Sequence, residues 1–554
     1  FNVLLPAGIT LDVILLLLTR NAYNVKQCAL EILNAKLSQS PTPFTKRHIE
    51  KLCAITSSIT SWLRNDSIDK EENILLMQSS LFTLKLLTRV ACCHEKQPFI
   101  QTLERVVALL HNWRSSNKVL LANAALCLAD IVSELGVQTL PLLPTYMIDI
   151  ISILKDETFT NDNELLIVGC LASLQKIVES LPKFLSPYLS DILRWVGVKS
   201  SKFPQSKYKN EVISRSNHIR KCLANLPLRI LIPAIDSSLL VEIDEARFMG
   251  SYQFIFDTLC DNVRQSTSDD ISNLVPDLTR IFLKALELRV MLVDQDEKYD
   301  VDIAESVTLN ALAALALKLS ENNLKTVLQK FIDWSGDQPH DRLITLIKMA
   351  LKLCDHLKGL FTLFAQPFIK MVADIMPKCH LSKSADQEKL FSDDSIQIKN
   401  NVLVVGSLNL ISKCCQYDNQ AFMTKERFDL LLKPLVEQID NTSLKNYVTR
   451  VDENLVPCFA NLAYAMNDDA AWKVLNYEVL IKTRSKKARV RLTALKVIES
   501  VYAKLGESIS ILIPETVPFI AELMEDDNED VERQCQKVVD VLEKIVGESL
   551  KDYF

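Results

Sequence analysis

Six basic side chains stand within ten residues near the C-terminal end of the sequence, and their spacing suits contact with an anion. Such a cluster can neutralise several phosphates of a nucleic acid, or bind an acidic helix of a partner protein. Runs of like charge are more often solvated helix faces, and no interleaved aromatic residues support base stacking. The candidate contacts with RNA or a partner are Lys482, Arg484, Lys486, Lys487, Arg489 and Arg491.

The ten glycines are too widely spaced to build a phosphate-binding loop. No two of them lie within 20 residues of each other. The P-loop, the dinucleotide fingerprint, the kinase glycine loop and the G-x-S-x-G elbow all need closely spaced glycines, because the backbone must approach the ligand or turn sharply. The sequence therefore excludes these motifs within its 554 residues.

Metal-binding motifs are absent as well. The sequence has no C-x-x-C and no H-E-x-x-H, and its seven histidines are scattered. The acidic runs 294–302 and 525–530 lack the glycine and terminal glutamate of an EF-hand. The fourteen cysteines stand mostly in apolar surroundings, which indicates reduced, buried thiols. We expect no enzyme activity, cofactor, metal site or small-molecule substrate, although catalytic groups that meet only in the fold stay open.

Charge and hydropathy narrow the class of partner. The net charge of −6 and the pI near 5.8 argue against a general electrostatic attraction to nucleic acid, but allow a local basic patch. The longest apolar run near the start, Val13–Leu18, is too short to cross a bilayer. We expect no membrane partner.

The elements that must position these side chains are helices. Glycine poverty disfavours the tight turns of β-structure, and similar segments recur at a regular spacing. Leu126 and Leu171 begin matching apolar runs 45 residues apart, and Val490 and Val531 begin equivalent helices 41 residues apart. Leu312 and Leu351 are separated by 39 residues. Two helices per 40 to 47 residues is typical of HEAT and armadillo arrays, so we predict an all-α solenoid of stacked antiparallel helix pairs.

One repeat is legible in full near the C-terminus. A first helix begins at Ile513-Pro514, an acidic turn follows at 525–530, and a second helix carries apolar residues at helical spacing from Val531 to Ile545. Gly547 is expected to end it.

Polar interruptions divide the array. Residues 199–211 are expected to form an exposed loop, 294–302 an acidic insertion and 380–401 a polar linker. The predicted domains are HEAT-like repeats over 1–225, an irregular helical domain of degenerate repeats over 226–380, a linker or loop over 381–401, and C-terminal HEAT repeats over 402–554.

Several segments resemble one protein family over roughly residues 226–376 and 482–554. The family is the large HEAT-repeat nucleolar protein of the small-subunit processome, which belongs to the UtpA subcomplex. The most specific segment is Lys-Gly-Leu-Phe-Thr-Leu-Phe-Ala at 358–365, whose apolar residues we expect in the core. The other matching segments are 226–233, 282–289, 331–334, 341–346, 367–374, 512–526, 532–537 and 553–554.

The resemblance implies a scaffold in the nucleolus, hence in the nucleus, that supports processing of pre-18S rRNA and transcription of ribosomal DNA. It implies other UtpA subunits as partners, with pre-rRNA or snoRNA as a further contact. Family members are several times longer, so residue 1 is expected far inside the full protein. The alternative is a general HEAT adaptor, such as a transport receptor or a phosphatase-type scaffold. No catalytic residue carries over from the family.

Overall fold

The computed structural model describes residues 7–20, 22–39, 44–63, 71–156, 160, 163–201, 207–239, 248–292, 301–336, 338–380, 390–391, 395–419 and 421–550. None of these residues lies in a β-strand, so the predicted all-α class is confirmed. The chain divides into two compact units, Phe1–Ile281 and Phe282–Phe554.

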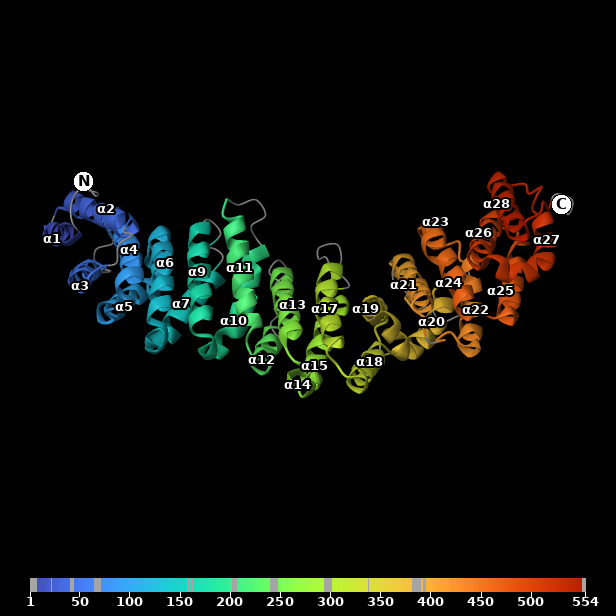
Figure 1. Ribbon diagram of the computed structural model, residues 1–554, viewed down its shortest axis with the longest axis horizontal. Helices are drawn as coiled ribbons and strands as arrows, with labels where there is room; N and C mark the ends of the chain where they lie inside the picture. The colour runs from blue at the N-terminus through green and yellow to red at the C-terminus, as the bar shows by residue number, and fades with distance from the viewer. Residues whose placement is uncertain are drawn as a thin grey trace. The chain divides into compact units, whose positions relative to one another are not determined.

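The first unit is a two-layer stack of helix pairs (Figure 1). In one layer α2, α4, α6, α9, α11 and α13 each pack on the next, and in the other α1, α3, α5, α7, α10 and α12 do the same. The bounds are α1 Ala7–Leu18, α2 Tyr23–Gln39, α3 Lys46–Thr60, α4 Glu71–Ala91, α5 Gln97–His111, α6 Lys118–Leu135, α7 Leu143–Lys155, α9 Glu164–Ser180, α10 Leu189–Ser201, α11 Lys209–Ala224, α12 Leu228–Ser238, α13 Phe248–Gln265, α14 Ser268–Ser272 and α15 Val275–Leu286.

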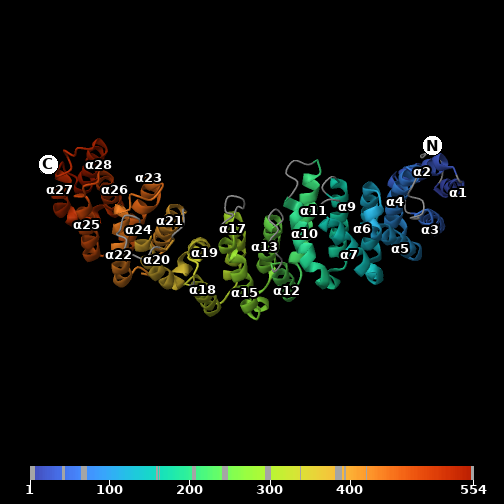
Figure 2. The same cartoon turned by 180° about the vertical axis from the view of Figure 1, so that it is seen from behind.

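The second unit, which begins inside α15, repeats the arrangement (Figure 2). One layer is α17, α19, α21, α24, α26 and α28, and the other contains α20, α22, α25 and α27 in succession. The bounds are α16 Leu288–Met291, α17 Val301–Ala316, α18 Glu321–Gly336, α19 Asp341–Leu357, α20 Gln366–Lys378, α21 Ile396–Gln416, α22 Lys425–Asp440, α23 Tyr447–Arg450, α24 Val456–Met466, α25 Asp469–Lys482, α26 Ala488–Leu505, α27 Ile513–Ala521 and α28 Glu529–Val546. A π-helical turn, Val451–Leu455, joins α23 to α24.

The sequence repeats coincide with neighbouring helices of one layer. Leu126 and Leu171 lie on α6 and α9, Leu312 and Leu351 on α17 and α19, and Val490 and Val531 on α26 and α28. The predicted C-terminal repeat is also confirmed, since α27 begins at Ile513 and α28 ends before Gly547. Because each helix pair leaves apolar faces uncovered, the next pair must stack on it.

Three connections between successive helix pairs use the same device. A residue with positive φ follows the helix end, and a seven-residue 3₁₀ helix then leads to a helix with proline in its first turn. The positive-φ residues are Gly136 (54°), Lys358 (50°) and Gly506 (59°). Glycine suits such a conformation because it has no Cβ, whereas Lys358 adopts it at a cost. The 3₁₀ helices are Gly136–Leu142, Lys358–Phe364 and Gly506–Leu512.

The family-like segment 358–365 forms the middle connection, and the expectation that its apolar residues belong to the core is only half right. Phe361 and Ala365 are fully buried, but Leu360 and Leu363 are 60% and 52% exposed. A 3₁₀ helix has about three residues per turn, so residues three apart share a face and here face outward together.

The polar interruptions are shorter than predicted. Helix α10 continues to Ser201, and the amine of Lys199 is buried where it donates a hydrogen bond of 2.7 Å to Thr160. Helix α21 begins at Ile396, inside the predicted linker, and Lys399 forms a 2.9 Å ion pair with Asp341. A polar composition suggested loops there, because the distant partners that allow burial of a lysine are invisible in a local window. Most of the insertion 294–302 and of the linker lies outside the described residues.

The division between compact units at residues 281 and 282 falls inside α15 and does not coincide with a predicted domain boundary. The predicted boundaries were drawn from composition and family resemblance, while the compact units reflect packing density alone. The four-part division therefore stays a prediction.

Candidate nucleic-acid interface

The six basic residues lie where α25 ends, turns and gives way to α26. Lys482 is the last residue of α25, residues 483–487 form the turn, and Arg489 and Arg491 belong to the first turns of α26. Val490, between the two arginines, is buried, so it anchors the start of α26 while its neighbours point elsewhere. The six residues are therefore close together in the chain but have different surroundings.

Three of the six are held by carboxylates of neighbouring repeats. Lys482 forms an ion pair with Asp440 at the end of α22. Arg484 Nε donates a hydrogen bond of 2.8 Å to Glu522, and its guanidinium lies 4.3 Å from the centre of the Phe519 ring.

Arg491 is the most enclosed of these three. Its Nε and Nη2 atoms each donate a 2.7 Å hydrogen bond to Asp526, and the two side chains are only 16% and 5% exposed. Burial alone would raise the pKa of Asp526, but the hydrogen bonds and charge of Arg491 outweigh it and lower that pKa. The side chains of all three residues join neighbouring repeats, and each is already paired with a carboxylate.

The other three basic residues are exposed. Within the part of the chain that the structure describes, the side chains of Lys486, Lys487 and Arg489 have no hydrogen bond or ion pair. We call Lys486, Lys487 and Arg489 the basic ridge. It keeps the features that a phosphate contact requires, namely free cations at the surface of a rigid helix start.

Two neighbouring segments contact the start of α26 near the basic ridge. The Tyr447 hydroxyl donates a 3.2 Å hydrogen bond to the Arg489 carbonyl, which joins the start of α23 to the first turn of α26. On the other side the Arg491–Asp526 pair brings in the acidic turn 525–530. Tyr447 itself is buried and offers no ring face to a base.

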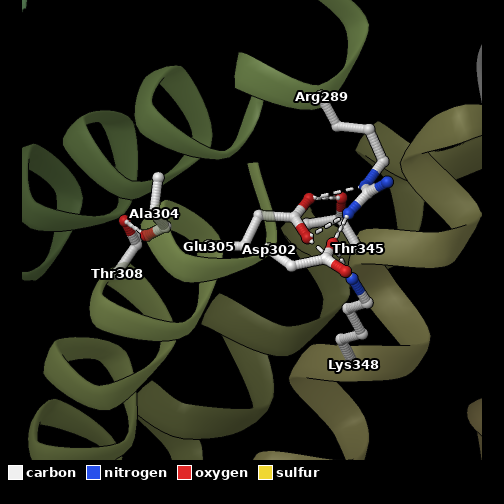
Figure 3. Close-up of polar contacts among 7 residues, drawn as sticks. All are labelled: Arg289, Asp302, Ala304, Glu305, Thr308, Thr345 and Lys348. Carbon is white, nitrogen blue, oxygen red and sulfur yellow. Dashed lines mark hydrogen bonds and ion pairs between the residues drawn. The ribbon is translucent and has the colours of Figure 1, made fainter. Parts of the chain in front are cut away.

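A second charged cluster joins α16, α17 and α19 (Figure 3). Glu305, almost fully buried, accepts hydrogen bonds from Arg289 Nε (2.8 Å) and from the Thr345 hydroxyl (2.6 Å), and pairs with Lys348 at 3.2 Å. Asp302 contacts the same two cations. In the same view the Thr308 hydroxyl donates to the Ala304 carbonyl within α17.

The protonation of this cluster points to a structural role. Burial by itself raises the pKa of Glu305, but the hydrogen bonds and charges of Arg289 and Lys348 outweigh it, so the pKa is lowered. The pKa of Asp302 is lowered in the same way. A general acid or base for work near neutral pH needs a carboxyl pKa close to 7, and these carboxyls are shifted away from it. The cluster holds three helices together.

One group of metal-compatible residues was missed by sequence reasoning. Ligand atoms of Glu179, His218 and Cys222 lie within 4.8 Å of one another. His218 and Cys222 are one turn apart on α11, a detectable signal, but Glu179 comes from α9. The Glu179 carboxylate already pairs with His218 at 2.6 Å and with Lys176 at 2.8 Å. Because the Glu179 carboxylate already has partners inside the protein, we interpret the group as a polar contact between α9 and α11. The expectation of no metal site stays a prediction.

Among the residues that the structure describes, two helical segments are long and apolar enough to cross a membrane by length and composition, 72–91 and 118–155. The bent pair Asp341–Phe364 and Gln366–Lys378 would count only if taken as one span across its 97° bend. Segment 118–155 is broken by the 3₁₀ helix after α6, and apolar residues of α6 pack against α4, α5 and α9. Packing within the stack accounts for that hydropathy, and the expected lack of a membrane partner stays a prediction.

Comparison with known proteins shows which proteins this chain is similar to. The BP28CT (NUC211) domain family matches residues 270–423, which include the Glu305 cluster. HEAT repeat-containing protein 1 of Homo sapiens is 34% identical over 560 residues, covering 100% of this chain and 26% of that protein. The chain is a homologue of HEAT repeat-containing protein 1. The protein of the same name from Danio rerio is 33% identical over 576 residues, again covering 100% of this chain and 26% of that protein.

A more distant relative carries a more specific name. U3 small nucleolar RNA-associated protein 10 of Schizosaccharomyces pombe is 23% identical over 534 residues, covering 96% of this chain and 30% of that protein. A solved structure of importin beta aligns with 98% of this chain and 68% of the importin beta chain at 9% sequence identity. The TM-score of this alignment is 0.40, which is too low to support an argument.

The resemblance stated from the sequence is therefore confirmed. The chain spans about a quarter of the length of the human relative. The helical-repeat architecture and the names of the relatives suggest a protein that is not an enzyme.

Proposed function

We propose that this chain is part of a scaffold subunit of the small-subunit processome, acting in the nucleolus during early ribosome biogenesis. In that role it supports processing of pre-18S rRNA and transcription of ribosomal DNA, and it assembles with other UtpA subunits. The observation that carries the proposal is the similarity to HEAT repeat-containing protein 1 along the whole chain, together with the U3-associated relative.

The architecture suits a scaffold physically. Stacked helix pairs bury their cores between repeats and leave long helix faces and turns free for partners. The free surface includes charged turns such as the basic ridge as well as exposed apolar residues.

The basic ridge is our candidate for direct contact with pre-rRNA or snoRNA. Its three cations are exposed on a helix start that Val490 and the Arg491–Asp526 pair hold rigidly. Backbone phosphates, and not bases, are the expected ligands, because no aromatic residue is interleaved with the cations of residues 482–491. Lys482, Arg484 and Arg491 take part only by holding the repeats, since carboxylates already bind them.

Affinity purification of the full-length protein tests the scaffold role. Processome subunits and pre-rRNA should be recovered, and depletion should cause unprocessed precursors of 18S rRNA to accumulate. Recovery of transport cargo or phosphatase subunits without an rRNA defect would instead support the general adaptor. Recovery of neither processome proteins nor pre-rRNA would overturn the proposal.

A charge-reversal variant tests the basic ridge. Lys486→Glu, Lys487→Glu and Arg489→Glu together should weaken RNA crosslinking and reduce the salt dependence of RNA binding, since about 0.7 is lost from the log–log slope for each single-strand phosphate contact removed. The matched control is Lys325→Glu, Lys330→Glu and Lys370→Glu, which reverses three exposed lysines on α18 and α20. If the two variants bind RNA equally well, the basic ridge is a solvated surface and not an RNA contact.

A further inference from the structure

Helix α25 exposes a continuous apolar stripe where α20 and α22 of the same layer expose mainly charged residues. Ala470, Val474, Tyr477 and Ile481 are all exposed, and the last three are 48%, 56% and 44% accessible. The opposite face of α25, which includes Trp472, Leu475 and Val479, is buried in the stack.

Helices α20 and α22 of the same layer have more polar outward faces. The exposed positions of α20 include Lys370 and Asp374, and those of α22 include Glu426, Asp429 and Lys433, with Leu430 (41% accessible) as its one exposed large apolar residue. Water-facing positions of a stacked helix are normally polar, so an apolar stripe indicates a surface that another element covers.

The spacing of the stripe is that of a coiled-coil seam. The intervals of 4, 3 and 4 residues place Ala470 and Tyr477 at d positions and Val474 and Ile481 at a positions of a heptad. β-Branched residues at a favour pairing of two parallel helices. Lys473 then falls at a g position and Glu478 at an e position.

These flanking charges identify the occupant. In a parallel pair of helices, each g residue faces the e residue five positions later on the other helix. Here the lysine of one copy would face the glutamate of the other, which gives one such ion pair on each side of the seam. Lys473 is already in an ion pair with Glu515 at 2.7 Å, but that pair is largely exposed and exchanges partners at little cost. Glu478 has no ion pair in the described part of the chain.

We propose that α25 is a self-association surface, on which α25 of a second copy of this chain packs in parallel about a two-fold axis. The seam consists of the four stripe residues from each copy, with two symmetric Lys473–Glu478 ion pairs along its edges. Such a short helix–helix contact falls in the class of small, weak interfaces, so it forms a reversible dimer at micromolar concentrations. The inference does not depend on the proposed processome role.

Sedimentation of the full chain over a micromolar concentration range tests the dimer. Lys473→Glu or Glu478→Lys alone should each weaken dimerisation by about fivefold or more, because both symmetric pairs become repulsive. The double variant Lys473→Glu/Glu478→Lys should restore the wild-type constant to within about twofold, because both pairs are re-formed with exchanged signs. Lys370→Glu on α20 is the matched control and should change nothing.

Covalent trapping gives an independent measurement. In a parallel pair equivalent d positions meet, so Tyr477→Cys should form a disulfide-linked dimer with copper–phenanthroline and oxygen, above the level that Cys28 and Cys93 give in the wild type. A chain that stays monomeric, or a dimer insensitive to every α25 variant, would overturn the proposal. Failure of the double variant to restore dimerisation would overturn the parallel pairing.

Discussion

Arg491 on α26 holds Asp526 in the following turn through two hydrogen bonds of 2.7 Å. The carboxylate also accepts a hydrogen bond of 2.9 Å from the backbone N–H of Asn528, the N-cap residue of α28. One ion pair thus links the candidate RNA-binding segment to the terminal repeat, and it separates the structural members of the basic cluster from the free ones.

Reversing Arg491 should damage the fold, whereas reversing a ridge residue should not. Arg491→Glu places two carboxylates together in a largely buried position, and we expect a loss of about 2–4 kcal/mol in the free energy of unfolding. Lys487→Glu, at an exposed site, should stay within about 0.5 kcal/mol of wild type. Urea unfolding monitored by hydrogen exchange of α26 and α28 measures both. An equal, small effect of the two changes would contradict the structural role of the pair.

The Glu305 cluster should make the second unit sensitive to acid. Because folding lowers the pKa of Glu305, its contribution is complete above the ordinary glutamate pKa of about 4.3 and is lost as the pH falls through the lowered value. Glu305→Gln should therefore be less stable than wild type at pH 7, by about 2–4 kcal/mol, yet lose less further stability on acidification.

Hydrogen exchange of peptides from α17 and α19 at pH 7 and at pH 4 or below tests the acid dependence. Glu453→Gln, at an exposed carboxylate in the same unit, is the control and should follow wild type. Parallel pH profiles for Glu305→Gln and wild type would contradict the linkage.

Replacing Lys358 by glycine should stabilise the protein. Lys358 occupies, with φ of 50°, the position that Gly136 and Gly506 hold in the equivalent connections. A side chain in this conformation is strained, so Lys358→Gly should add about 1 kcal/mol to the free energy of unfolding. The reciprocal change Gly506→Lys should cost a similar amount, although a built Cβ there meets no neighbour within 4 Å. Denaturant midpoints measure both, and a destabilised Lys358→Gly variant would refute the assignment of strain.

Thiol reactivity should follow burial. Cys28 and Cys93 are exposed, whereas Cys127 and Cys170 are fully buried. Burial raises the pKa of Cys170 to about 12 and that of Cys127 further, so both stay protonated and unreactive at pH 8. Alkylation followed by mass spectrometry should label Cys28 and Cys93 first in the native protein and all four in urea. Native labelling of Cys127 at the rate of Cys93 would contradict the packing of α6.

Much of the fold could be predicted because it depends on the local periodicity of apolar residues along the chain. The intervals between Leu126 and Leu171, and between Val490 and Val531, correspond to adjacent helices of one layer. The shared connector was overlooked, although leucine, a turn residue and a later proline recur around Gly136 and Gly506. Its conformation depends on φ, which a search for apolar stripes does not detect.

The sequence indicated the candidate site, and the structure separated its residues into those that are paired and those that are free. Six basic residues in ten were evident from charge alone, because a cluster within two turns stays together in any helical fold. Which of them are free depends on carboxylates that are far away in the sequence, such as Asp440 for Lys482 and Asp526 for Arg491. The same holds for Lys199 and Lys399, which a polar window assigned to loops and which distant partners hold inside the stack.

The sequence by itself determined the class, the repeat and the family, since each of these depends on short-range pattern or on similarity along the chain. Only the tertiary structure decided which charges are used between repeats and which remain for partners, and where an apolar stripe such as that of α25 is left uncovered. The physical reason is that stacking brings together side chains about one repeat apart, and burial and pairing energies depend on those neighbours.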